Sequence, residues 1–308
     1  MKGLKLAEEY FYAHGFSMLK DKFSTYIDRI AIGFAGPGSE CFGFDDEISH
    51  DHDWGPGFCL WLTEKDFADI GDVLQKEYLN LPQKFKGYGP RVASPGEERR
   101  VGVTGIKEFY SKYTGLNHIP ETNSEWLYIP EQALATCVNG KIFLDTLGRF
   151  SQWRETLLSF YPEDVRMKKI SSRCMTIAQA GQYNFQRSFK RGDIFTGRYA
   201  EIQFCTDVIS LLFLLNRRYT PFYKWMHRAV RDLPILGGDL FRLIGELLSE
   251  LDLNKKGAIM EYISAILIKE LRAQGLSDSP SDFLLDQAHV IHKKIKDPKL
   301  REQFAVIR

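Results

Sequence analysis

Two aspartates separated by one residue are the side chains of this sequence best suited to hold a metal ion. Asp51 and Asp53 open an expected strand over residues 51–62. Residues two apart on a strand point to the same face about 6.5 to 7 Å apart, so both carboxylates can face one cation or a pair of cations. Magnesium prefers carboxylate and phosphate oxygens, and two such ions about 3.5 to 4 Å apart support in-line displacement at phosphorus. The spacing therefore predicts that Asp51 and Asp53 bind Mg²⁺.

A glycine-containing loop lies ahead of these aspartates and can approach a phosphate group. Residues 29–35 form a short apolar run typical of a buried strand, and Gly38 and Ser39 follow it. The backbone N–H groups of such a loop can surround a triphosphate, and the Ser39 hydroxyl can donate to it. We expect Gly38 and Ser39 to bind a nucleoside triphosphate, with ATP as the expected nucleotide.

These two features together resemble a known signature. An apolar strand, Gly-Ser, a spacer of about a dozen residues and Asp-His-Asp are similar to the motif of the polymerase β-like nucleotidyltransferase superfamily. The segments GSECFGFDDEISHDHDWGP and YTPFYKWMHRAVRDLP more closely resemble an uncharacterised bacterial family described only as a domain of unknown function. The motif itself covers about twenty residues, and the wider resemblance covers most of the chain.

The resemblance implies a fold, an activity and a cofactor. The fold is α+β: a nucleotidyltransferase-like mixed sheet with flanking helices, followed by an all-helical C-terminal domain. The activity is magnesium-dependent transfer of a nucleoside monophosphate from a nucleoside triphosphate to a hydroxyl acceptor, which is a small molecule or a protein. The alternative is a catalytically silent nucleotide-binding or sensing protein with the same fold. The resemblance names no acceptor.

Members of this superfamily use a third carboxylate on a later strand, and this sequence departs from that pattern. The expected strand over residues 101–106 carries no acidic residue. Asp145, at the end of an expected strand over residues 141–145, is the better-placed candidate, and Glu108 is the alternative. Without a third carboxylate the silent alternative gains support.

Two residues of the helical half are further candidates. Glu201 opens a helical segment and is predicted to be the base that activates the acceptor hydroxyl; the competing interpretation is a surface acid paired with Arg198 at i,i+3. Lys224 lies in a stretch similar to the lysine-bearing segment of streptomycin-type adenylyltransferases, which implies a contact with the nucleotide phosphates. The competing interpretation for Lys224 is an exposed lysine.

Other chemistries have less support. His50 and His52 alternate with the aspartates, so one strand cannot turn all four side chains toward one ion. Cys59 lies in a very apolar run typical of a core, and Cys41 has no neighbouring cation in sequence to lower its pKa. The glycine order of residues 33–38 does not fit a dinucleotide-binding loop.

The elements that would position these residues divide the chain in two. Strands are expected in four short apolar segments up to residue 145, with a helix over residues 64–79 that Thr63 caps. After residue 150 only three-to-four periodicity is seen, which is typical of helices. We therefore expect a nucleotidyltransferase-like domain over residues 1–150 and a helical bundle domain over residues 151–308.

Composition and charge limit the partners. The chain has 308 residues, 44% of them hydrophobic, and 41 basic against 40 acidic residues give a net charge of +1. Such a balance provides no overall field for a polyanion, which disfavours nucleic acid as a partner. Five scattered cysteines fit a reducing compartment, and the longest apolar run, about eight residues, is well short of the twenty of a membrane span. A cytoplasmic location without membrane contact is expected, and the oligomeric state stays open.

Overall fold

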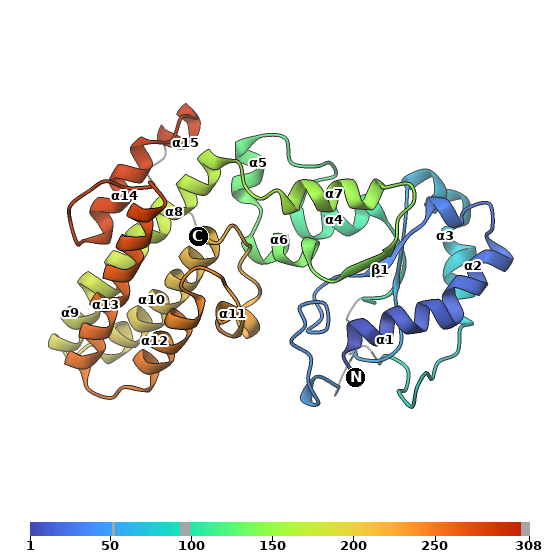
Figure 1. The fold of residues 1–308 in the computed structure, drawn as a ribbon, viewed down its shortest axis with the longest axis horizontal. Coiled ribbons are helices and arrows are strands. Elements are labelled where there is room, and N and C mark those ends of the chain that lie inside the picture. The colour runs from blue at the N-terminus through green and yellow to red at the C-terminus, as the bar shows by residue number, and fades with distance from the viewer. Residues whose placement is uncertain (51–52, 93–98, 303–308) are drawn as a thin grey trace. The chain divides into compact units, whose positions relative to one another are not determined.

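The computed structural model describes residues 1–50, 53–92 and 99–302 (Figure 1). The chain forms two compact units. The first unit comprises Met1–Pro120 and Ala133–Ser159, and the second comprises Glu121–Gln132 and Phe160–Arg308. The second unit takes in residues 121–132 because helix α5 (Asn123–Tyr128) packs on helix α8 (Glu163–Ile177).

A four-stranded mixed sheet is the centre of the first unit. Its strands follow the order β3-β2-β1-β4. β1 is antiparallel to both of its neighbours, whereas β2 and β3 are parallel. The strands are β1 (Ala31–Phe34), β2 (Cys59–Leu62), β3 (Gly102–Gly105) and β4 (Lys141–Leu144). The mixed sheet and the helices around it confirm the predicted α+β class.

The second strand begins later than predicted. β2 starts at Cys59, whereas the sequence pattern placed its start at Asp51. Asp53 has a φ of +43° and Gly55 a φ of +149°, which are incompatible with a regular strand. The expectation that residues 51 and 53 share one strand face is therefore wrong for Asp53. Asp51 and His52 lie outside the described residues.

Helices cover both faces of the sheet. One face packs on α1 (Gly3–Tyr10), a π-helical turn (Phe11–Gly15), α2 (Phe16–Lys22) and α3 (Glu64–Leu79) around a core that includes Leu60 and Leu62. On the other face Trp61 stacks on Phe150 with ring centroids 4.0 Å apart. This alternation within β2 follows from the period of two in a strand. The Thr63 side chain accepts from the backbone N–H of Asp66, which confirms the predicted cap of α3.

Three further helices belong largely to the first unit. They are α4 (Ile106–Thr114), α6 (Glu131–Val138) and α7 (Arg149–Leu158). α4 begins directly after β3 and ends at Gly115, whose φ of +74° provides a left-handed C-terminal cap.

The described residues of the second unit form helices and no strand. α10 lies at its centre and is apolar around much of its circumference, as expected for a buried helix. None of the described helices has the length and apolarity that a membrane span requires. The remaining helices are α9 (Gln186–Lys190), α10 (Ile194–Leu215), α11 (Tyr223–Val230), α12 (Gly237–Ser249), α13 (Leu253–Ala273), α14 (Leu284–Lys293) and α15 (Pro298–Glu302), and a π-helical segment (Ala178–Phe185) joins α8 to α9.

Candidate functional site

One end of the sheet brings together residues that the sequence separates widely. Because β1 and β2 are antiparallel, the loop after β1 and the segment before β2 meet at the same end, with Gly33 opposite Cys59. Gly38 and Ser39 lie in that loop, and Asp53 lies in that segment. β3 runs parallel to β2 and begins at the same end, so Arg100 lies there as well. We call this region the sheet-end site.

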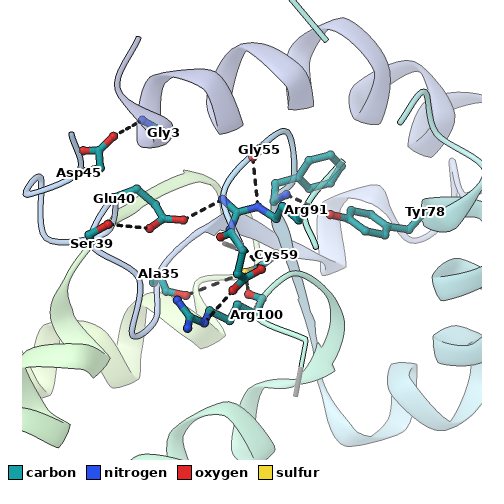
Figure 2. A network of polar contacts seen from close by, with 12 residues as sticks. Gly3, Ala35, Ser39, Glu40, Asp45, Gly55, Cys59, Tyr78, Arg91 and Arg100 are labelled. Carbon is teal, nitrogen blue, oxygen red and sulfur yellow. Dashed lines mark hydrogen bonds and ion pairs between the residues drawn. The ribbon is translucent and has the colours of Figure 1, made fainter. Parts of the chain in front are cut away.

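Arg91 joins the two sides of the sheet-end site (Figure 2). Its guanidinium donates to the backbone oxygens of Asp53 at 2.7 Å and Gly55 at 3.1 Å, and to Oε1 of Glu40 at 2.9 Å. It also lies 4.8 Å above the ring of Phe34 at the end of β1. The side chains of Arg91 and Glu40 are only 5% and 3% exposed, so this is a buried ion pair. Sequence reasoning missed both residues.

Asp53 is held by two guanidinium groups. Its Oδ2 lies 2.8 Å from Nε of Arg100, and its Oδ1 lies 3.8 Å from a terminal nitrogen of Arg91. The Asp53 side chain is 5% exposed. A carboxylate buried this deeply is costly unless it is paired, and the two arginines compensate its charge.

The predicted phosphate-binding loop is closely packed against Glu40. A Cβ on Gly38 would lie 2.4 Å from Oε2 of Glu40, so a larger residue there would displace the Glu40 carboxylate. The Ser39 hydroxyl is half-buried and lies 3.5 Å from the same oxygen, which is a weak contact. The Ser39 carbonyl accepts from the backbone N–H groups of Phe42 and Phe44. The loop is thus a tight turn whose serine hydroxyl makes no strong bond to the core.

The residues described at this site do not by themselves form a magnesium site. They contain no group of three or more His, Cys, Asp or Glu side chains placed to hold a metal ion. Asp53 supplies one carboxylate, which is already paired with Arg100. Asp51, the second predicted ligand, lies outside the described residues, as does His52. The ring of His50 packs against Trp54 with centroids 3.7 Å apart and the ring planes tilted by 32°.

Of the two candidates for a third carboxylate, Asp145 lies away from the sheet-end site and Glu108 lines only the hollow beside it. β4 is antiparallel to β1 and pairs Phe34 with Lys141, so Asp145 follows the opposite end of the sheet. Its side chain accepts from the backbone N–H groups of Gly148 at 3.0 Å and Ser151 at 2.7 Å, which stabilises the turn into α7. Glu108 lies beyond the far end of β3, where it caps α4. The predicted catalytic placement of Asp145 is therefore wrong.

A basic hollow of about 550 Å³ adjoins the sheet-end site. Arg99, Arg100 and Lys112 line it, with Glu108 as the acidic residue among its described lining. Trp61 and Gln75 also line it, and no acceptor among the described residues bonds to the buried indole Nε1 or the buried amide Nε2. Unsatisfied buried donors and cations together favour an anionic ligand.

A smaller hollow of about 320 Å³ shares part of this lining. Arg99, Arg100 and Gln75 line both hollows, and Asp53 and Arg91 line the smaller one. The ion pairs of the sheet-end site therefore border space that a ligand can enter.

The cysteines near the site are not nucleophiles. Burial raises the pKa of Cys59 to about 12, and its Sγ donates to the backbone oxygen of Arg100 at 3.3 Å. Burial and the neighbouring Glu40 carboxylate raise the pKa of Cys41 well above its usual value. Both thiols therefore stay protonated at neutral pH, as core cysteines do.

The two candidate residues of the second unit have different surroundings. Glu201 on α10 is 3% exposed; its Oε1 pairs with the buried Lys256 and its Oε2 with Arg198 at 2.8 Å. The i,i+3 pair with Arg198 is confirmed, but Glu201 is buried and both its oxygens are paired, so the base role has no geometric support. Lys224 is exposed near the start of α11, and its phosphate contact stays a prediction.

A second ionic cluster, also missed by sequence reasoning, lies within the second unit. Glu131 accepts from Thr220 at 2.8 Å and Ser210 at 2.9 Å, and it lies 3.2 Å from Arg173 and 3.8 Å from Lys169. Burial works against ionisation, but Lys169 and Arg173 hold the pKa of Glu131 below its usual value. The only sequence feature that points to this cluster is the i,i+4 spacing of Lys169 and Arg173 on α8. These residues line a hollow of about 350 Å³.

Comparison with known proteins found one family model and a solved structure that are similar to this chain. The model of a family described as a domain of unknown function, DUF4037, matches residues 126–226, about a third of the chain. Among solved structures, the chain is similar to the crystal structure of a nucleotidyltransferase-like protein from Exiguobacterium sibiricum 255-15. The two chains are 12% identical, with a TM-score of 0.37 over 89% of this chain and 81% of that one. A likeness this distant carries no argument about activity. No curated protein matches the chain.

Proposed function

We propose that the first unit binds a nucleoside triphosphate, ATP being the expected nucleotide, at the sheet-end site. The reaction that this binding serves is magnesium-dependent transfer of a nucleoside monophosphate to a hydroxyl acceptor, a small molecule or a protein. In that reaction the acceptor oxygen forms a bond to the α-phosphorus, the bond to pyrophosphate breaks, and the hydroxyl proton passes to a base.

One observation carries the proposal. The antiparallel pairing of β1 and β2 places the Gly38–Ser39 loop and Asp53 at the same end of the sheet, beside a hollow lined by three cations. A tight loop with a weakly bonded hydroxyl can donate to phosphate oxygens, and the guanidinium of Arg100 can form paired bonds with them. The Ser39 hydroxyl and the Arg100 guanidinium would together bind the phosphate oxygens and compensate their charge.

Asp51 and Asp53 would be the protein ligands of the magnesium ion. Bound magnesium would neutralise phosphate charge. Because Asp53 is paired with Arg100 in this structure, binding of a cation requires that pair to separate. The lysine of the helical unit, Lys224, is proposed as a further phosphate contact on the strength of the sequence resemblance.

A specific observation favours a second candidate function, nucleotide binding without transfer. Asp145 lies at the wrong end of the sheet, and Asp53 is compensated by arginines as in a structural ion pair. A protein that kept the loop and the basic hollow but lost its metal carboxylates would bind nucleotides and leave them intact.

Calorimetry with a nonhydrolysable ATP analogue tests binding, and pyrophosphate release over a broad panel of hydroxyl acceptors tests transfer. We expect affinity in magnesium that falls in chelator, and that falls in Asp51→Asn and Asp53→Asn while the fold is kept. Lys224→Ala should lower affinity about five- to thirtyfold, the scale of one charged hydrogen bond, with exposed Lys65→Ala as the control. Magnesium-independent binding without pyrophosphate release would select the second candidate, and absence of binding would refute both.

A further inference from the structure

The first turns of α10 expose aromatic rings that a folded protein usually covers. Phe195 is 80% exposed and Tyr199 is 53% exposed. They lie one helical turn apart in the first turns of α10, and their rings are nearly parallel with centroids 6.4 Å apart. Exposed apolar side chains that gather on one surface indicate an interaction site more often than isolated ones do.

These rings belong to one exposed face of α10. With 3.6 residues per turn, Phe195, Arg198, Tyr199 and Ile202 fall within an arc of about 100°. Ile202 is 56% exposed, and the side chain of Arg198 is 53% exposed. The first two turns of α10 therefore present an apolar surface with the guanidinium of Arg198 at its edge.

The same region is locally basic. Residues 186–199 contain four cationic side chains and one acidic residue, Asp193, which caps α10. Arg198 shares the carboxylate of Glu201 with Lys256, so these three groups keep a net positive charge. The guanidinium of Arg187 lies 4.2 Å above the exposed ring of Tyr183, a second pairing of a cation with an aromatic ring. The net charge of the whole chain, +1, gives no sign of this local excess of basic residues.

We propose that this surface binds single-stranded nucleic acid. Proteins that do so combine cations along the strand with aromatic rings on which bases stack. The rings of Phe195 and Tyr199 are near-parallel, with centroids 6.4 Å apart, and both are exposed, so bases can stack on them. We call the surface the α9–α10 tip; it comprises Tyr183, Arg187, Lys190, Arg191, Phe195, Arg198 and Tyr199.

Charge argues against other occupants of the α9–α10 tip. A second copy of the chain would bring two basic surfaces face to face, which is unfavourable. An acidic protein would satisfy the cations, but it would not need two parallel rings. The proposal is independent of nucleotide binding by the first unit, since every residue it uses lies in the second.

The test is fluorescence anisotropy of a labelled oligouridylate of about twelve nucleotides with the full-length protein. We expect binding that weakens as salt rises from about 50 to 200 mM. Phe195→Ala with Tyr199→Ala should weaken it about 5- to 100-fold. Lys190→Gln with Arg191→Gln should weaken it and reduce the salt dependence.

Tyr12→Ala is the matched control, because Tyr12 is a comparably exposed tyrosine in the first unit, 51% exposed. Thermal melting of each variant shows that the fold is kept. Absence of binding at low salt, or equal affinity of the aromatic variant and the control, would overturn the proposal. Equal binding of a polyglutamate peptide, lost in the charge variant and kept in the aromatic variant, would assign the tip to an acidic protein instead.

Discussion

Each unit of the protein buries a group of two carboxylates and two cations, and the two groups are held in different ways. In the first unit, Glu40, Asp53, Arg91 and Arg100 all lie in loops around the end of the sheet. Asp53 has a left-handed φ, and the Glu40 carboxylate packs closely on Gly38. The group depends on irregular backbone and borders two hollows.

In the second unit, Glu131, Lys169, Arg173 and Asp207 all lie on helices. Hydroxyl groups of Ser210 and Thr220 complete the bonds of Glu131. Regular backbone holds this group, so its geometry costs no backbone strain. Both groups border hollows, so the difference between them lies in the backbone: helices hold the second group, whereas irregular loops hold the first.

The largest effect should come from removing the central cation of the sheet-end site. Arg91→Ala leaves Glu40 buried without its guanidinium and removes the donor to the Asp53 and Gly55 carbonyls. Breaking a buried pair in this way costs about 3 to 5 kcal/mol. Denaturant unfolding should show that loss, and Arg149→Ala, at an exposed position of α7, should change stability by less than about 0.5 kcal/mol. If the two variants lose the same free energy of unfolding, Arg91 does not hold the first unit together.

A somewhat smaller loss is expected in the helical cluster. Glu131→Ala leaves Lys169 and Arg173 buried side by side, although Asp207 stays 3.9 Å from Arg173. We expect about 2 to 4 kcal/mol of destabilisation in denaturant unfolding. Glu246→Ala, which removes an exposed i,i+4 pair on α12, is the control and should cost less than about 1 kcal/mol. If Glu131→Ala destabilises the protein no more than Glu246→Ala does, the cluster does not stabilise the second unit.

The helical cluster should also give a dependence on pH. The folded pKa of Glu131 lies below its ordinary 4.5, so its ionised form stabilises the fold above that pH. As pH falls below 4.5, the unfolded chain takes up the proton first, and this stabilisation is lost progressively. The stability difference between wild type and Glu131→Gln should therefore shrink as the pH falls from about 5 to 3. A difference that is constant over this range would contradict the ion pairing of Glu131.

The smallest effect on stability is expected for the loop hydroxyl. Ser39→Ala removes a half-buried group whose one side-chain contact, to Glu40, is weak, so stability should change by less than about 0.5 kcal/mol. Affinity for a nucleoside triphosphate should fall by about 0.5 to 1.5 kcal/mol, the net worth of a hydrogen bond. Calorimetry and thermal melting separate the two. A large drop in melting temperature with unchanged affinity would make Ser39 structural.

Local signals in the sequence predicted much of the fold. Apolar runs ended by glycine or proline located β1 and β4, and Thr63 with acidic residues after it located the start of α3. The start of β2 was placed too early because residues 53–58 are buried and partly apolar like a strand, yet the left-handed φ of Asp53 is set by contacts with distant Arg91 and Arg100. Backbone conformation imposed by such long-range bonds leaves no local pattern.

The site was predictable only where its residues are close in sequence. Gly38, Ser39 and Asp53 fall within one motif, but Arg91 follows Glu40 by 51 positions within a segment that resembles a surface loop. The direction of β4 decides where Asp145 lies, and sequence alone does not give that direction. Glu131 meets its partners from three different segments, which no spacing rule connects.

The central claim, that the sheet end of the first unit is a nucleotide site, is tested most directly by a crystal structure with magnesium and a nonhydrolysable nucleoside triphosphate. The account predicts phosphate oxygens within hydrogen-bond distance of the Ser39 hydroxyl and of the guanidinium of Arg100, with the Asp53–Arg100 pair separated. Phosphates bound in the hollow beside Glu131, or a sheet end unchanged at saturating nucleotide, would contradict it.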